Sequence, residues 1–125
     1  MFIEMLKCKI HRATVTEADL NYTGSLTLDE NLMNAVGLLE YEKIHVLDIT
    51  NGSRIETYVI RGNKGSGKVC INGAAAHLIH EGDLIIIVSY CQLLDIEAQD
   101  HVPRIIHVNK KNQVIIKFKD ESILV

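Results

Sequence analysis

The chain has few of the residues that mark a membrane, nucleic-acid-binding or disulfide-bonded protein. It contains no tryptophan, one proline and three cysteines in 125 residues, and its formal net charge is −3. The longest apolar run, Leu84 to Val88, is too short to span a bilayer, and no basic excess indicates nucleic acid. Cys8, Cys70 and Cys91 are an odd number without a C-x-x-C pair, which is typical of a reducing compartment.

The N-terminus also lacks a targeting signal. The segment Met-Phe-Ile-Glu-Met-Leu-Lys has an acid where a signal peptide has bases, and it has no apolar core. A composition of 47% hydrophobic and 23% charged residues, without a low-complexity run, is that of a single globular domain. We therefore expect a cytoplasmic protein with no membrane span and no nucleic-acid partner.

Two β-hairpins dominate the pattern of the sequence. Lys43–Thr50 alternates between apolar and polar residues and is followed by Asn51-Gly52 and a second alternating run, Arg54–Ile60. Asn-Gly between two such runs is the strongest short hairpin signal. A second hairpin is predicted near the end, where Arg104–Val108 and Gln113–Phe118 flank a turn.

One buried strand and one helix complete the expected elements. Leu84–Tyr90 is continuous and β-branched, as in a strand buried on both faces. Asp29 can cap a helix that Gly37 ends. The apolar stripe of that helix would consist of Leu32, Met33 and Val36. A mostly β chain of this length closes into a barrel or a sandwich, and periodicity does not choose between them.

The dipeptide Gly24-Ser25 has the chemistry of a self-cleavage site. A glycine peptide can adopt strained backbone conformations, and the Ser25 hydroxyl lies one bond past the Gly24 carbonyl that it would attack. The resulting ester can eliminate and hydrolyse to leave a pyruvoyl group in place of Ser25. By itself, however, Gly-Ser most often marks an ordinary turn.

Other motifs lie in register with this dipeptide. They are Lys7-Cys-Lys-Ile-His-Arg12 upstream and, downstream, Thr50-Asn-Gly-Ser-Arg-Ile-Glu-Thr-Tyr58, Asn72-Gly-Ala-Ala-Ala-His77 and Gly82-Asp-Leu-Ile-Ile-Ile87. In this order and spacing the chain resembles the bacterial aspartate 1-decarboxylases, pyruvoyl-dependent enzymes that make β-alanine for pantothenate biosynthesis. The resemblance runs from about Met5 to Ser89, and little aligns past Cys91.

The resemblance implies a fold, a cofactor and an assembly. The fold would be mainly β, a six-stranded double-psi β-barrel with one or a few short helices, as a single domain over residues 1–125. The precursor would be cleaved into a short chain, 1–24, and a pyruvoyl chain, 25–125. The covalently bound pyruvoyl group from Ser25 would act on L-aspartate in a homotetramer with active sites at subunit boundaries, and a maturation factor is a possible partner.

The resemblance also assigns roles to one strand. Arg54 would bind a substrate carboxylate, Tyr58 would donate a proton, and Thr57 would assist self-cleavage and line the substrate pocket. Alternation places Arg54, Glu56 and Tyr58 on one face and Thr57 on the other. Without the resemblance, the same residues are a solvated arginine, a β-favouring threonine and a half-buried tyrosine. Their chemistry suits the roles, because guanidinium binds carboxylate bidentately and tyrosine is protonated at neutral pH.

Two further segments complete the expected substrate site. Lys9 and His11 are two residues apart and share a strand face, which is ordinarily a wet surface; the resemblance makes Lys9 a second carboxylate anchor and puts His11 at the pocket edge. Which of Lys9 and Arg54 holds which carboxylate stays open. Asn72-Gly73-Ala74-Ala75 is either a tight turn into a short helix or a ligand-binding segment, and the resemblance favours binding by Asn72, Gly73, Ala74 and Ala75.

Two apparent motifs are rejected. Gly62–Lys68 fits the first seven positions of the phosphate-binding pattern, but Val69 replaces the required hydroxyl and a strand follows instead of a helix. We interpret it as a flexible hairpin loop. A metal site is not expected, since the spacing of the cysteines and histidines matches no zinc pattern. A non-catalytic double-psi module and a nucleotide-binding protein built on the Gly62–Lys68 loop are the alternative functions.

Overall fold

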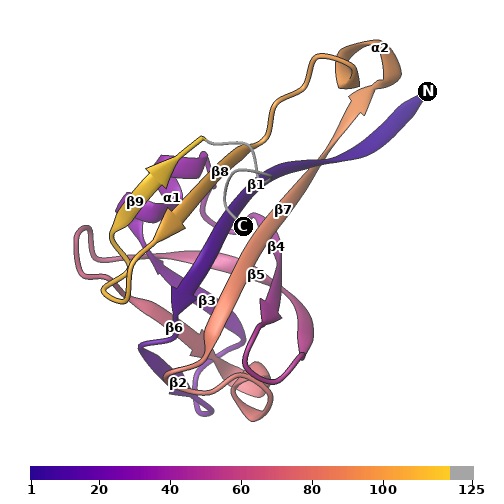
Figure 1. Cartoon of the computed structure of the whole chain (residues 1–125). Coiled ribbons are helices and arrows are strands. Elements are labelled where there is room, and N and C mark those ends of the chain that lie inside the picture. The colour runs from indigo at the N-terminus through magenta and orange to yellow at the C-terminus, as the bar shows by residue number, and fades with distance from the viewer. Residues whose placement is uncertain (119–125) are drawn as a thin grey trace.

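The chain forms one mixed β-sheet with short helices at its margins (Figure 1). The computed structural model describes residues 1–118, so the last seven residues of the predicted pyruvoyl chain lie outside the described part. The strands are β1 (Phe2–Thr14), β2 (Glu17–Asp19), β3 (Ser25–Asp29), β4 (Lys43–Asp48), β5 (Arg54–Gly62), β6 (Val69–Asn72), β7 (Leu84–Leu94), β8 (Arg104–Val108) and β9 (Val114–Lys117). The helices are α1 (Glu30–Val36), the 3-10 helix η1 (Gly73–His77) and α2 (Asp95–Ala98).

The mainly β class is confirmed, but the expected count of six strands is wrong. Within residues 1–118 the sheet has nine strands in the order β2-β6-β3-β5-β4-β7-β1-β8-β9, and this series is open rather than closed into a ring. The extra strands have a simple origin. The β8–β9 hairpin joins the sheet through parallel pairing of β8 with β1, and the three-residue β2 adds to β6 at the other edge.

The longest pairing joins β1 to β7 and forms an arm. The two strands run antiparallel from Phe2 opposite Leu94 to Thr14 opposite Leu84. Figure 1 shows that the far end of this pair extends away from the rest of the molecule, with α2 at its tip. Phe2 and Ile96 are 66% and 71% exposed there, so the arm carries large apolar side chains that this chain leaves uncovered.

The predicted hairpins and helix are confirmed. β4 pairs antiparallel with β5 around Gly52, whose φ of +80° suits the turn. β8 and β9 form the second hairpin. Asp29 caps α1 by accepting a hydrogen bond from the Asn31 backbone N–H, and Gly37 ends the helix in a left-handed conformation. The three predicted stripe residues of α1 are buried.

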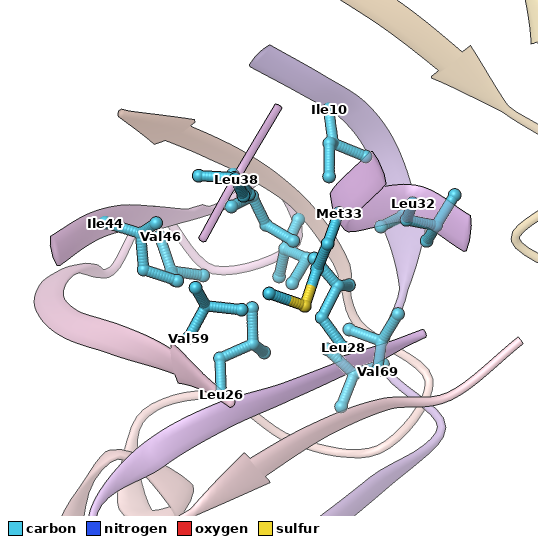
Figure 2. Close-up of a cluster of buried hydrophobic side chains, with 14 of the residues drawn as sticks. Ile10, Leu26, Leu28, Leu32, Met33, Leu38, Ile44, Val46, Val59 and Val69 are labelled. Atoms are coloured by element: carbon cyan, nitrogen blue, oxygen red, sulfur yellow. The ribbon is translucent and has the colours of Figure 1, made fainter. Parts of the chain in front are cut away.

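The core lies between α1 and the inner faces of the strands (Figure 2). Met33 from α1 lies among leucine, isoleucine and valine side chains of β3, β4, β5 and β6. The labelled members of this cluster are Ile10, Leu26, Leu28, Leu32, Met33, Leu38, Ile44, Val46, Val59 and Val69. β7 is longer than predicted, and only one of its faces is fully buried: Ile85 and Ile87 are core residues, while Ile86 is half-buried.

The rejected phosphate-binding pattern is a loop tied to the start of α1. The backbone N–H groups of Gly65 and Gly67 donate to the two carboxylate oxygens of Asp29 at 2.9 and 2.8 Å. These are the donors that a phosphate would need, and a carboxylate of the chain already occupies them. The strand predicted after this loop is confirmed as β6, but the predicted hairpin is wrong, because β3 lies between β5 and β6 in the sheet.

Candidate active site

Ser25 is the first residue of β3 and is almost completely buried. Its exposed fraction is 1%, which is unusual for a serine at a strand end. The reason lies in pairing on both sides, since β3 runs antiparallel to β6 and parallel to β5. The residue directly opposite Ser25 on β6 is Asn72.

Asn72 holds the Ser25 hydroxyl. The Asn72 Nδ2 group donates to Ser25 Oγ at 2.9 Å and to Thr27 Oγ1 at 2.9 Å. On the other side, Cys70 Sγ donates to Asn72 Oδ1 at 3.1 Å. Asn72 itself is 3% exposed, so this amide works in a site with little water, where hydrogen bonds are electrostatically stronger.

The crowded glycine of the site is Gly73 rather than Gly24. Gly24 is absent from the positive-φ residues of the described chain, and a Cβ added to it would meet nothing within 4 Å. Gly24 therefore does not have a left-handed backbone, and strain at its peptide stays a prediction. Gly73 has φ +74°, and its added Cβ would lie 2.7 Å from Gly24 Cα and 2.9 Å from the Tyr22 carbonyl oxygen. Only a glycine at position 73 lets the two backbones cross this closely.

The register between β3 and β5 points to Tyr58 as the neighbour of Ser25 on β5. Leu26 pairs with Val59, and extending this parallel register by one residue sets Ser25 next to Tyr58. Because Leu26 and Val59 are core residues, alternation places Ser25 and Tyr58 together on the opposite face of the sheet. Tyr58 is 37% exposed, and its ring centroid lies 6.4 Å from that of Tyr41.

The other two residues predicted on β5 lie apart from this pair. Thr57 is half-buried on the opposite face of the strand, with Ile44 as its cross-strand partner. Arg54 is exposed, opposite Leu47 on β4, and it enters none of the salt bridges formed among residues 1–118. Arg54 shares the Tyr58 face but lies four residues away, about 13 Å along an extended strand.

Lys9 and His11 come from a more distant part of the sheet. Both are half-buried on β1, where they alternate with the buried Cys8 and Ile10, so the predicted shared face is confirmed. Three strands, β5, β4 and β7, lie between β3 and β1 in the sheet order. The His11 ring stacks on His107 of β8 at 4.4 Å between centroids. Pairing with adjacent strands therefore does not bring Lys9 to Ser25 within one chain.

The small-residue segment after Asn72 turns directly into a short helix. Gly73 begins the 3-10 helix η1, in which Ala74 is exposed and Ala75 half-buried. The predicted turn into a short helix is therefore present, and ligand binding by this segment stays a prediction. Because residue 74 is an alanine, no bulky side chain covers the surface beside the Gly24–Gly73 crossing.

Two cavities formed by the described residues do not include Ser25 in their lining. One of about 550 Å³ is lined by Thr16, Glu17, Ser66, Lys68 and Glu81. Another of about 420 Å³ is lined by Asp29, Asn31, Leu32, Gly65, Ser66, Gly67, Lys111, Asn112, Gln113 and Val114. Cavity size therefore does not locate the candidate site. Among residues 1–118 there is also no cluster of three or more histidine, cysteine or acidic side chains with metal-binding geometry.

Sequence reasoning missed two members of the site, Cys70 and Thr27. Both touch Asn72, and the sequence carries a signal for one of them. Cys70 and Asn72 are two residues apart on a strand and so share a face. Thr27 has the same relation to Ser25 on β3, but a threonine in a strand is too common to stand out.

Comparison with known proteins assigns this arrangement to a family. A model of the aspartate decarboxylase family matches residues 1–115, so the chain belongs to that family. The match continues well past Cys91, further than the sequence motifs indicated. Among the described residues, no helix is long and apolar enough to cross a membrane.

Individual relatives agree. The chain is 59% identical to an aspartate 1-decarboxylase of Caldicellulosiruptor bescii, over 92% of this chain and 90% of the relative. It is 59% identical to one of Corynebacterium efficiens, over 92% and 85% of the two chains. A third, from Clostridium botulinum, is 57% identical over 91% and 90%.

Proposed function

We propose that this chain is a precursor that cleaves itself between Gly24 and Ser25 and then decarboxylates L-aspartate to β-alanine and CO₂. The observation that carries the proposal is the buried Ser25 hydroxyl, which accepts a hydrogen bond from Asn72 beside the crossing of Gly24 and Gly73. Membership of the aspartate decarboxylase family supplies the substrate and the place of the reaction in pantothenate biosynthesis.

Self-cleavage uses atoms that already lie in this site. Ser25 Oγ attacks the Gly24 carbonyl carbon, the Gly24–Ser25 C–N bond breaks, and the freed nitrogen takes up the serine proton. In the ester that results, loss of the Ser25 Cα proton expels the Gly24 carboxylate and leaves a dehydroalanine. Addition of water to its imine tautomer releases ammonia and leaves the pyruvoyl ketone at position 25.

The residues around Ser25 fit a pyruvoyl group. Asn72 Nδ2 lies 2.9 Å from Ser25 Oγ, the oxygen that leaves with the Gly24 carboxylate, so this donor lies beside the carbon atoms that become the pyruvoyl group. The site is buried, which protects a reactive ketone from water. Once formed, the group supplies a carbonyl electron sink for the electrons that decarboxylation releases, as pyridoxal phosphate does in other enzymes.

The chain's own side chains then bind substrate and handle a proton. Tyr58, which precedes the Leu26-paired Val59 on β5, would donate the proton that β-alanine acquires. Arg54 and Lys9 would anchor the two carboxylates of aspartate, while Thr57, His11, Gly73, Ala74 and Ala75 would line the pocket. Lys9 lies on β1, three strands away from β3 in the sheet order, and Arg54 lies four residues from Tyr58 along β5, so this assignment needs a second subunit to complete the site.

A homotetramer with sites at subunit boundaries meets that requirement. The exposed apolar side chains of the β1–β7 arm are suited to burial against another copy. Parallel pairing of β3 with β5 and of β1 with β8, mixed with antiparallel neighbours, is compatible with the double-psi barrel of the resemblance. A cytoplasmic location and a maturation factor that speeds cleavage remain parts of this proposal.

The test is the fate of Ser25. The wild-type protein should separate on a denaturing gel into fragments 1–24 and 25–125, and mass spectrometry should find pyruvoyl at the start of the longer one. Ser25→Ala should stay a single chain and release no CO₂ from aspartate, because alanine has no hydroxyl to attack with. A folded, uncleaved wild-type protein would favour a non-catalytic module, and nucleotide binding that Lys68→Ala abolishes would favour the phosphate-binding alternative.

A further inference from the structure

We propose that Cys70 is a positioning residue for self-cleavage, because its thiol hydrogen bond turns the Asn72 amide so that the NH₂ group faces Ser25. This inference rests on the proposed self-cleavage. Cys70 lies on β6 two residues before Asn72, and both side chains are buried at 3% exposure. Nothing in the chemistry of the reaction requires a cysteine here, so its role must come from its contacts.

The amide of Asn72 has two possible orientations, and its neighbours decide between them. Ser25 and Thr27 carry hydroxyls, which accept or donate equally well and so do not distinguish the amide oxygen from its nitrogen. Cys70 favours one orientation, because its S–H can donate to the amide oxygen, although weakly, whereas the amide NH₂ in that place would meet only a weak sulfur acceptor. Among the described contacts of Asn72, the Cys70 thiol at 3.1 Å is the one that fixes Oδ1 on its own side.

The Cys70 thiol is protonated and close enough to Asn72 Oδ1 to donate this hydrogen bond. Burial raises the pKa of Cys70 to about 11, with the nearby Glu17 carboxylate acting in the same direction, so the group keeps its proton at neutral pH. The Ile71 backbone carbonyl oxygen is a second acceptor, 4.0 Å from Cys70 Sγ. The shorter contact, to the Asn72 side chain, is the stronger hydrogen bond.

Orientation matters because Ser25 must become an alkoxide as it attacks. With the NH₂ group toward Ser25, Asn72 donates to Oγ and stabilises the negative charge that develops there. With the amide reversed, Oδ1 would accept a hydrogen bond from the Ser25 hydroxyl, and the developing alkoxide would lose its Asn72 donor. Thr27 accepts the second N–H and keeps the amide saturated in the productive orientation.

The test compares three substitutions at position 70 in the full-length precursor. Cleavage is followed on denaturing gels after purification of the uncleaved chain, and folding is checked by thermal unfolding. Cys70→Ala should slow cleavage about tenfold, the effect of losing one hydrogen bond. Cys70→Ser keeps a donor and should restore most of the rate, whereas Cys70→Val fills the space without a donor and should stay slow.

Cys8 provides a matched control. It is a buried cysteine whose sulfur lies 3.1 Å from Ser89 Oγ, on strands far from Asn72. Cys8→Ala should lower the melting temperature by a similar amount without changing the cleavage rate. If Cys70→Ala does not fold, the serine and valine variants still give the comparison.

The outcomes are distinct. Cleavage at the wild-type rate in Cys70→Ala or Cys70→Val would overturn the positioning role, as would a serine variant as slow as the alanine variant, since packing would then explain the loss. A wild-type chain that never cleaves would overturn the proposed function itself.

Discussion

At the scale of single residues, the candidate site depends on the close approach of two backbone segments, at Gly24 and Gly73, as much as on its reactive side chains. The two glycines Gly24 and Gly73 meet where the chain is to be cut, and only one of them is conformationally obliged to be glycine. Asn72, next to Gly73, holds the nucleophile. The segment 72–73 therefore sets both the position of the Ser25 hydroxyl and the approach of the peptide bond that it attacks.

Gly73→Ala should therefore disrupt both stability and processing. A Cβ at φ +74° costs about 1–2 kcal/mol, and here it would also lie 2.7 Å from Gly24 Cα, so the crossing must open. We expect a lower melting temperature and little cleavage on a gel. Gly24→Ala serves as a stability control because its Cβ meets nothing within 4 Å. Normal cleavage in Gly73→Ala would contradict the importance of the crossing.

Tyr58→Phe should separate processing from turnover. The ring and its packing against Tyr41 remain, so folding and cleavage at Gly24–Ser25 should proceed normally. Loss of the phenolic proton should slow CO₂ release from aspartate at least tens of times, since general acid catalysis typically contributes about 10²–10⁴-fold. The measurement is the rate per cleaved chain. Near-normal turnover would mean that another group, such as water or Tyr22, delivers the proton.

At the scale of elements, the local signals in the sequence predicted what local interactions determine. The Asp29 cap, the Gly37 stop and the Asn51-Gly52 turn act within a few residues, and each forms as predicted. The β8–β9 hairpin was found for the same reason.

What the sequence did not reveal depends on contacts between distant segments. β2 exists only because β6 is there to pair with it, and three residues carry no recognisable period of their own. The open nine-strand order depends on which edges meet, which alternation does not encode. Asn72 was predicted as a substrate ligand, but its bonds to Ser25 and Thr27 join two distant segments and form only once β3 and β6 align.

A carboxyl pair joins the first hairpin to the start of β7. Asp48 ends β4 and accepts the Thr50 and Asn51 backbone N–H groups through Oδ1, while its buried Oδ2 has no donor among residues 1–118. Burial raises the pKa of Asp48, and hydrogen bonding to Asp83 raises it further. The same hydrogen bond lowers the pKa of Asp83, so we place the shared proton on Asp48.

Asp48→Asn should imitate the protonated form and stabilise the protein at neutral pH. Because the folded pKa of Asp48 is raised, its favourable contribution is complete below the ordinary value near 3.9 and is lost as pH rises through the folded pKa. The asparagine keeps the Oδ1 acceptor and adds a permanent donor toward Asp83. We expect a melting temperature a few degrees above wild type at pH 7 and little difference at pH 4. Equal stability at both pH values would contradict the shared proton.

At the scale of the whole molecule, the division at Gly24 does not divide the structure. β1, in the predicted short chain, lies between β7 and β8, and β2 pairs with β6. The exposed apolar arm that β1 forms with β7 is the surface through which further copies would complete the site. In the proposed function, one chain therefore holds the self-cleavage residues, while aspartate turnover would require the assembly.

Unfolding should accordingly respond to cleavage in a measurable way. Ser25→Ala should refold after dilution from denaturant, because its strands remain on one chain. The cleaved wild-type protein should recover poorly, and its recovery should rise when purified fragment 1–24 is added in excess. Equal recovery of the two proteins without added fragment would contradict the role given to β1.

The position of β1 between two strands of the other fragment also means that unfolding after cleavage would be hard to reverse. Before the cut, folding is a unimolecular search along one chain; after it, regaining the same sheet is a bimolecular encounter whose odds depend on dilution. If the chain is cleaved as proposed, the mature protein would be held folded by its barrier to unfolding rather than by a reversible equilibrium. In the uncleaved chain, β1 is covalently linked to the strands that it pairs with. In the cleaved protein that link would be gone, so a molecule that loses fragment 1–24 could regain it only by binding a free fragment.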